Sequence, residues 1–176
     1  MELSDAQTRA LIDLLDKQAI TENMQRYCRG VDRFDLELLQ SVYWAEATDD
    51  HGQYNGSAHI FAEWVCNKKQ IYDALFHLTS PSHVELLGDQ ARVETYFLCM
   101  IRYNDRYAQG ASDYMIGGRY KDLCEKRNGD WKILRRTVLW DWDVDQKTLS
   151  NWQRINMPHD KNFGRPKPDD QIYSQW

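Results

Sequence analysis

Residues 91–103 read ARVETYFLCMIRY, a run without proline or glycine that is rich in β-branched and aromatic residues. Successive side chains of a strand point to opposite faces, so this segment is predicted to be one long strand. One face carries Val93, Thr95, Phe97, Cys99 and Ile101, and the other carries Tyr96, Leu98, Met100 and Arg102. Because both faces hold large side chains, the strand is predicted to belong to a curved sheet with helices on one side.

Further strands are predicted on both sides of this segment, at 83–87, 113–126 and 131–144. Turn dipeptides separate them, namely Gly88-Asp89 and Asn128-Gly129. Asn-Gly is typical of the tight two-residue turn of a hairpin. Gly117-Gly118 lies within a predicted strand and indicates a bulge or a sharp bend.

The first half of the chain is predicted to be helical. Ser4 and Gln7 have the spacing of a capping box, and apolar residues follow at helical spacing as far as Val31. Asp35 is placed to cap a second, short helix. A short strand and a tight turn at Asn55-Gly56 are predicted next, followed by a third helix over 57–75.

Helices followed by antiparallel strands define an α+β fold class. We expect one domain over 1–145. The remaining residues, 146–176, contain three prolines and little periodicity, so we expect a tail that wraps onto the body or onto a neighbouring subunit.

The charge balance narrows the classes of partner. The net charge is −5 and the pI is near 5.5, which argues against nucleic acid and against anionic membrane surfaces. No apolar run approaches the ~20 residues of a membrane-spanning helix, and the first residues lack the pattern of a signal peptide, so we expect a cytoplasmic protein. The four cysteines are scattered without a C-x-x-C pair, which favours free thiols over disulfides or zinc.

Asp32 lies among apolar residues, where a carboxylate has to be paired or to serve chemistry. His77 lies in a second apolar stretch and is the natural partner, because a His held beside a carboxylate is a proton-transfer unit. The alternatives are structural: Asp32 caps a helix or pairs with Arg29 or Arg33, and His77 is a satisfied core residue.

Two other groups of charged residues are candidates for a site. Asp49, Asp50 and His51 resemble metal ligands. On a strand only Asp49 and His51 would share one face, and there is no clear third ligand, so we expect no metal. Four arginines of the predicted sheet are interpreted as charges on its faces. We expect one of these arginines to point into a cavity, but alternation alone does not identify which one. These are Arg102, Arg119, Arg135 and Arg136.

The order of elements and several motifs resemble the SnoaL-like branch of the NTF2-like superfamily. The motifs are Tyr27-x4-Asp32-x2-Asp35, Asp49-Asp50-His51-Gly52-x-Tyr54-x-Gly56, Phe76-His77-Leu78, Gly117-Gly118-Arg119-Tyr120 and Gly129-x-Trp131-x-Ile133. This resemblance implies a cone-shaped fold, in which a strongly curved, mostly antiparallel sheet wraps around a cavity lined by helices. It also implies enzymes such as dehydratases and dehydrochlorinases, most of which use neither cofactor nor metal.

Carried over to this chain, the resemblance assigns His77 and Asp32 as the catalytic pair. It also places Tyr27 and His51 in the pocket, and we expect Tyr54 and Trp140 to bind substrate there too. The sequence departs from the family in two places. His51 stands where related dehydratases have a tyrosine, and Leu139-Trp140-Asp141 occupies the region where lyases have an arginine.

These expectations lead to a cofactor-independent lyase with a dehydratase-like mechanism, acting on a small hydrophobic cyclic or aromatic substrate. Alternatives are a retro-aldol lyase that releases formaldehyde from lignin-type diaryl compounds, and a non-catalytic β subunit or scaffold of a ring-hydroxylating dioxygenase. An apolar, aromatic outer sheet face needs cover, and relatives are commonly oligomers, so we expect a homodimer or homotrimer.

Overall fold

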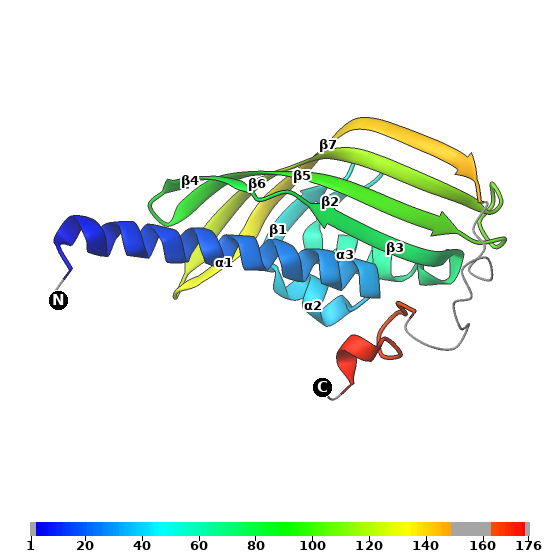
Figure 1. Ribbon diagram of the computed structural model, residues 1–176, viewed down its shortest axis with the longest axis horizontal. Helices are drawn as coiled ribbons and strands as arrows, with labels where there is room; N and C mark the ends of the chain where they lie inside the picture. The colour runs from blue at the N-terminus through cyan, green and yellow to red at the C-terminus, as the bar shows by residue number, and fades with distance from the viewer. Residues whose placement is uncertain (1–2, 149–162, 175–176) are drawn as a thin grey trace.

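The computed structural model describes residues 3–148 and 163–174, and its centre is one curved sheet of seven strands (Figure 1). The order is β2-β1-β7-β6-β5-β3, with β4 also paired to β5. Only β1 and β7 run parallel, while the other neighbours are antiparallel. The strands are β1 Tyr43–Asp50, β2 Asn55–Ser57, β3 Tyr72–Thr79, β4 His83–Leu87, β5 Gln90–Tyr103, β6 Ser112–Arg127 and β7 Asp130–Lys147.

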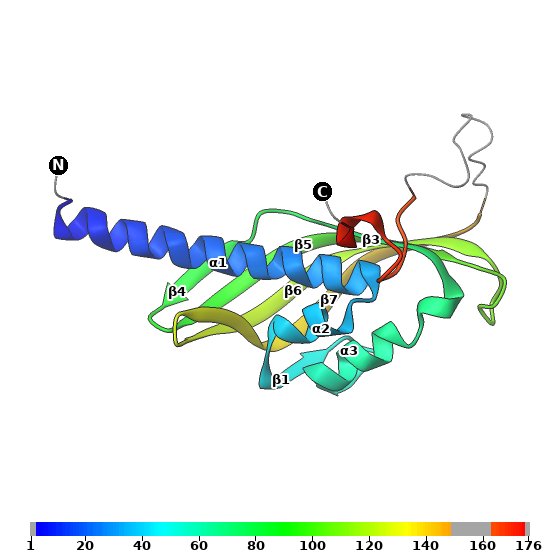
Figure 2. The same ribbon diagram turned by 90° about the horizontal axis from the view of Figure 1, so that it is seen from below.

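Three α-helices lie against one face of this sheet (Figures 1 and 2). They are α1 Asp5–Arg33, α2 Leu36–Ser41 and α3 Ala58–Cys66, with short 3-10 helices at Lys69–Ile71 and Gln171–Tyr173. Helices packed on one side of a curved, open sheet confirm the predicted α+β class. No helix within the described residues combines the length and the apolar character needed to cross a membrane.

Strand β5 shows the predicted alternation: Ala91, Val93, Thr95, Phe97 and Cys99 are buried toward the helices. The turns at Gly88 and at Asn128-Gly129 are confirmed, and all three residues have positive φ. These inward side chains form the core together with the inner face of α1, which contributes Ile20, Met24, Tyr27 and Val31.

The helix caps also follow the sequence. The Ser4 side chain accepts from the backbone N–H of Gln7 while the Gln7 side chain accepts from the backbone N–H of Ser4, so the capping box is confirmed. Asp35 caps α2 by accepting from the backbone N–H of Leu38 at 3.2 Å. The first turns of α1 project beyond the sheet, and their leucines, such as Leu14 at 62% exposure, stay in solvent.

Two predictions about the middle of the chain were wrong. The third helix ends at Cys66 instead of residue 75. The chain continues into strand β3, which contains His77. β-Branched and aromatic residues of 71–79 prefer a pleated surface, which outweighs their apolar spacing. The tight turn lies at 51–54, where Gly52 has a φ of +73°, and Asn55-Gly56 is strand.

Two irregularities interrupt the pairing of β6 with β7. One lies between Gly117 and Gly118, which confirms the predicted bulge. A Cβ atom on Gly117 would lie 2.2 Å from the indole nitrogen of Trp142, so a larger residue would have to displace that side chain. At the other, Leu123 pairs with Arg135 and Cys124 with Ile133, which leaves Leu134 as an extra residue.

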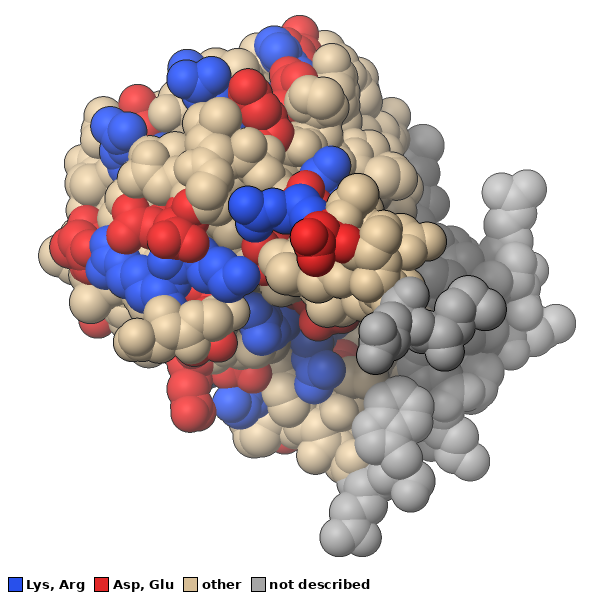
Figure 3. Space-filling model, turned by 90° about the vertical axis from the view of Figure 1, so that its left-hand side faces the viewer, with Lys and Arg blue, Asp and Glu red and all other residues tan. Residues whose placement is uncertain are grey.

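The described part of the tail lies against the end of α1. Lys167 Nζ binds a carboxylate oxygen of Asp35 at 2.8 Å, and Arg33 Nη1 lies 3.4 Å from Asp170. The division of the chain at residue 145 stays a prediction, as does contact of the tail with another subunit; most of that tail lies outside the described residues. Figure 3 shows positive and negative side chains intermingled on the end of the molecule from which α1 projects.

Candidate functional site

A cavity of about 140 Å³ lies between the concave face of the sheet and helices α1 and α3. Its wall is mostly aromatic, with Tyr27, Phe61, Phe97 and Tyr120 among the lining residues. An apolar protein cavity of roughly 150 Å³ accommodates benzene, so this chamber matches one six-membered ring. In such a wall a bound molecule finds few hydrogen-bonding groups, so the few polar side chains that are present would fix its orientation.

Asp32 and His77 meet beside this cavity, as the sequence predicted: His77 lines the cavity, and Asp32 stands behind it. Asp32 lies in the last turn of α1 and His77 in the middle of β3, and His77 Nδ1 is 2.5 Å from Asp32 Oδ1. The second carboxylate oxygen accepts the backbone N–H of His77 at 2.9 Å. Because the carboxylate faces Nδ1, the neutral ring carries its proton there, and its basic lone pair is on Nε2.

The surroundings of His77 favour its protonated form. Burial alone lowers the pKa of His77, but the neighbouring Cys99 and Asp32 outweigh it and raise the pKa well above its ordinary value. Cys99 pairs with His77 across β3 and β5, and its thiol also lines the cavity. Sequence reasoning missed Cys99 as a cavity residue, although its place on the inward face of the predicted strand was the available signal.

Tyr27 lies one and a half turns before Asp32 on α1, and its ring is 6.4 Å from the ring of His77. The side chain is fully buried and lines the cavity, and its hydroxyl has no hydrogen-bond partner among the described residues. Burial raises the pKa of Tyr27 far above its usual range despite the nearby Arg136. The hydroxyl is therefore a neutral donor, and a buried donor of this kind invites a ligand oxygen.

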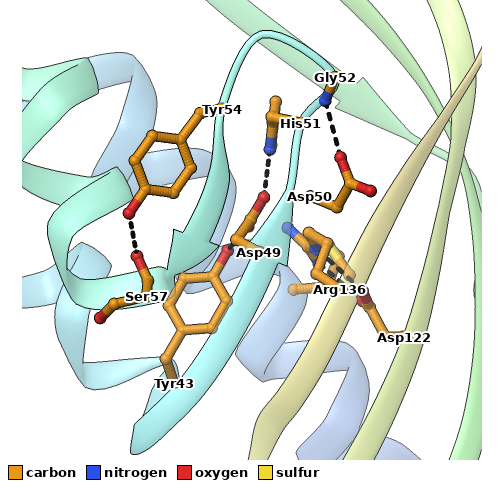
Figure 4. Close-up of polar contacts among 10 residues, drawn as sticks. Tyr43, Asp49, Asp50, His51, Gly52, Tyr54, Ser57, Asp122 and Arg136 are labelled. Carbon is orange, nitrogen blue, oxygen red and sulfur yellow. Dashed lines mark hydrogen bonds and ion pairs between the residues drawn. The ribbon is translucent and has the colours of Figure 1, made fainter.

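His51 belongs to a second pair on another wall of the cavity (Figure 4). Its Nδ1 lies 2.5 Å from Asp49 Oδ1, and the other oxygen of Asp49 accepts the hydroxyl proton of Tyr43 at 2.7 Å. Asp49 is completely buried. Burial raises its pKa, but His51, Arg136 and Tyr43 outweigh burial and lower it. The sequence placed His51 in the pocket but did not connect it with Asp49.

Behind this pair lies a row of buried charges. Asp49, Arg136 and Asp122 occupy matching positions on β1, β7 and β6. Arg136 donates two bonds to Asp122, at 2.8 and 2.7 Å, and its guanidinium lies 4.1 Å from the ring centres of both Tyr27 and Tyr120. Burial of Asp122 raises its pKa even though Arg136 opposes the shift.

Arg136 is the inward arginine that alternation did not identify. Leu134 adds one residue to β7, so that Ile133 and Arg136, rather than Ile133 and Arg135, face the core. An arginine of the last strand is thus present on the concave side, four residues before Trp140. It stands behind Tyr27 and Tyr120 and supports the wall, while those two rings line the cavity.

The two remaining predicted site residues have different positions. Trp140 lines the cavity, with its ring 5.9 Å from that of His51 and 5.7 Å from that of Phe97. Tyr54 is not among the lining residues: its ring packs on Phe61, and its hydroxyl donates to the carbonyl of Ser57 at 2.8 Å (Figure 4). We therefore place Tyr54 in the support behind Phe61 and no longer expect it to bind substrate.

A groove of about 510 Å³ adjoins the cavity and shares several wall residues with it, including His51, Tyr114 and Trp140. One ring thus fits in the inner chamber, and a further part of a ligand would extend past Trp140. Within 3–148 and 163–174, no three His, Cys, Asp or Glu side chains are grouped as metal ligands.

Solved structures with this fold include two enzymes of small-molecule chemistry. A hexachlorocyclohexane dehydrochlorinase, LinA-type3 from Novosphingobium barchaimii LL02, has 18% identity and a TM-score of 0.70 over 81% of this chain and 99% of its own. A candidate scytalone dehydratase from Novosphingobium aromaticivorans DSM 12444 has 19% identity and a TM-score of 0.68 over 77% and 91%.

A third similar structure is an NTF2-like superfamily protein from Salmonella enterica serovar Typhimurium strain LT2. It has 19% identity and a TM-score of 0.62 over 72% of this chain and 91% of its own. At these identities the likeness establishes the shared fold. No functionally curated protein matches the sequence. The model of the SnoaL-like domain matches residues 13–137, more than two thirds of the 176 residues, so the chain belongs to the SnoaL-like domain family.

Proposed function

We propose that the protein is a lyase that eliminates water from a small cyclic or aromatic alcohol by acid–base catalysis. The observation that carries this proposal is the Asp32–His77 pair, whose imidazole lines an aromatic cavity of one-ring size. Two proteins of the same fold are described as a dehydrochlorinase and a candidate scytalone dehydratase, and both names denote eliminations.

In this proposal Nε2 of His77 removes a proton from the substrate carbon next to the one that bears the hydroxyl. Asp32 holds the ring in the required tautomer and stabilises the imidazolium that forms. General-base catalysis of this kind contributes typically about 10²–10⁴-fold in rate. The unpartnered hydroxyl of Tyr27 is placed to donate a hydrogen bond to the oxygen of the substrate.

The test is a survey of cyclic and benzylic alcohols, followed by the ultraviolet absorbance of the conjugated alkene that elimination produces. We expect His77→Gln to abolish turnover without changing the circular dichroism spectrum. His83→Gln is the matched control, because His83 is an exposed histidine at the start of β4 that does not line the cavity. An active His77→Gln enzyme would refute the assignment.

A second reaction is favoured by the groove that adjoins the cavity at Trp140. Two connected compartments suit a two-ring molecule, which is the kind of substrate expected for a retro-aldol lyase. His77 would then take the proton of a substrate hydroxyl, the C–C bond would break, and formaldehyde would leave. The other carbon would keep the electron pair and take a proton from the His77 imidazolium. A colorimetric assay for formaldehyde with diaryl substrates separates this reaction from dehydration, which releases only water.

We also propose that copies of the chain associate through the outer face of the sheet. Phe76 and Leu78 of β3 and Tyr96 of β5 alternate with inward residues and are 47%, 57% and 58% exposed. Apolar patches of this kind usually mark an interface. Light scattering on a gel-filtered sample measures the molar mass, and a homodimer or homotrimer is expected; a monomer would contradict the proposal.

A further inference from the structure

The wall that carries His51 repeats the arrangement around His77. In both pairs a ring Nδ1 lies 2.5 Å from a carboxylate oxygen, and both rings line the same cavity. In both, a further hydrogen bond fixes the carboxylate: the backbone N–H of His77 for Asp32, and the hydroxyl of Tyr43 for Asp49. The cavity thus has two oriented imidazoles, whereas the proposed elimination has so far used one.

We propose that His51, oriented by Asp49, is a second catalytic residue, the acid that protonates the departing oxygen. This inference rests on the proposed function, because it assigns the second proton transfer of the same reaction. With Nδ1 directed at Asp49, the ring of His51 offers Nε2 to a ligand in the cavity. Asp49 is a positioning residue, since it is completely buried and acts through the imidazole.

The ring of His51 is held rigidly, as a proton donor requires. Phe61 of α3 stacks on it at 4.2 Å between ring centres with an interplanar angle of 21°, and Trp140 contacts it edge-on from β7. A donor whose orientation is fixed before the reaction adds no reorganisation free energy to the barrier. The short turn at 51–54 holds the backbone, because the N–H of His51 donates to the carbonyl of Tyr54 at 2.7 Å.

His51 bonds to one member of the buried row of charges. The buried row contains two carboxylates, Asp49 and Asp122, and one guanidinium, Arg136. Arg136 directs both of its short bonds to Asp122, so Asp49 is left with His51 and the Tyr43 hydroxyl as its hydrogen-bond partners. A lysine, Lys68, also lines the cavity, and its ammonium lies 3.1 Å from the centre of the Trp64 ring.

The full reaction then balances with two histidines. Nε2 of His77 takes the proton from carbon, and the C–H electron pair becomes the new π bond. The C–O bond breaks with its electron pair on oxygen, which takes the proton of the His51 imidazolium and leaves as water. His77 ends protonated and His51 neutral, and one proton passing between them through solvent restores the starting state.

The experiment compares two ring-matched substrates, an alcohol and the corresponding chloride. Hydroxide is a poor leaving group that needs a proton, whereas chloride leaves without one. We expect His51→Gln to lower kcat for the alcohol by about 10²–10⁴-fold, with less than about fivefold loss for the chloride. Asp49→Asn should show the same selectivity to a smaller degree, while His77→Gln disables both reactions.

A second measurement uses the alcohol alone. An acid that must be protonated gives kcat a limb that falls as pH rises, and this limb should be present in wild type and absent in His51→Gln. Equal losses for both leaving groups, or an unchanged pH profile, would overturn the role of His51 while leaving His77 in place. If the wild-type protein eliminates neither group from any substrate, the proposed function itself fails.

Discussion

The two histidine–carboxylate pairs have the same short contact but are built in different ways. Asp32 comes from a helix and His77 from a strand 45 residues later, so the first pair exists only when α1 has docked on the sheet. Asp49 and His51 are two residues apart at the end of β1, so the second pair is local. The first pair therefore depends on tertiary packing, whereas the second depends on its buried neighbours.

This difference teaches where each pair is vulnerable. Asp32 is 8% exposed, and among the described residues its carboxylate bonds to His77, through the ring and the backbone N–H. Asp49 has none and is shared between His51 and Tyr43 beside a buried Arg136. Changes at Asp32 should therefore act on chemistry, and changes in the buried row should act on stability first.

The largest effect is expected for Asp32→Asn. The amide can still accept from the backbone N–H of His77, but it can also donate to Nδ1, which favours the wrong tautomer and removes the charge that stabilises the imidazolium. We expect a loss of roughly 10³–10⁴-fold in kcat, with little change in the unfolding midpoint at alkaline pH, where His77 is neutral. Steady-state kinetics and urea unfolding measure the two quantities, and a large loss of stability without a loss of kcat would contradict this division.

Arg136→Met should act on stability instead. It leaves Asp122 buried without its two bonds, and breaking a buried pair in this way costs about 3–5 kcal/mol. Urea unfolding measures the loss. Arg135→Met is the matched control. The Arg135 side chain is exposed, so its replacement should change the free energy of unfolding by no more than about 0.5 kcal/mol. Similar losses of unfolding free energy in the two variants would show that the buried row of Asp49, Arg136 and Asp122 does not stabilise the fold.

The pH dependence sharpens the comparison at His77. A general base works in its neutral form, and the pKa of His77 is raised, so kcat/KM for the chloride, which needs no acid, should keep rising with pH above 6.5, by up to about tenfold per unit. Stability has the opposite sign. The stabilising contribution of protonated His77 is complete below its unfolded pKa of about 6.5 and is lost as pH rises through the folded pKa.

Rate profiles and urea unfolding of wild type and His77→Gln across pH test both statements. The difference in unfolding free energy between the two proteins should be largest at low pH and should shrink toward alkaline pH. A rate that levels off below pH 6.5 would show that the pKa of the base is not raised.

The smallest effect is expected for Tyr43→Phe. The variant removes one hydrogen bond to Asp49, worth about 1 kcal/mol, and leaves the ring packing and the first pair intact. We expect at most about a fivefold loss in the elimination of hydroxide and none for chloride. Tyr54→Phe is a suitable control, since Tyr54 also donates one hydrogen bond, to the carbonyl of Ser57 at 2.8 Å, but does not line the cavity.

Much of the fold was predictable, because alternation in β5 and the caps of α1 and α2 are local signals. The position of His77 on a strand was not, since the apolar residues of 57–75 also have helical spacing and the break at Cys66 carries no proline or glycine. The Asp32–His77 pair was predictable as a pair of chemically unusual residues. The link of Asp49 to His51 was missed, because both were weighed as metal ligands and not as partners of each other.

Arg136 shows the physical limit of a sequence pattern most clearly. Parity along a strand holds only between bulges, and nothing in the residues around Leu134 marks the added position. Asp122 became recognisable as its partner only when the register of β6 with β7 was known.

The added residue at Leu134 has a consequence for how this strand tolerates change. A saturation library of β7 should reveal two sets of sensitive positions that are out of step, odd-numbered at Trp131 and Ile133, and even-numbered at Arg136 and Val138. Deleting the single residue Leu134 would remove the bulge and join the two sets into one regular alternation, in which Arg136 still faces the core and Arg135 still faces outward. The bulge thus decides which of two adjacent arginines belongs to the interior, because strict alternation from Ile133 without a bulge would turn Arg135 inward.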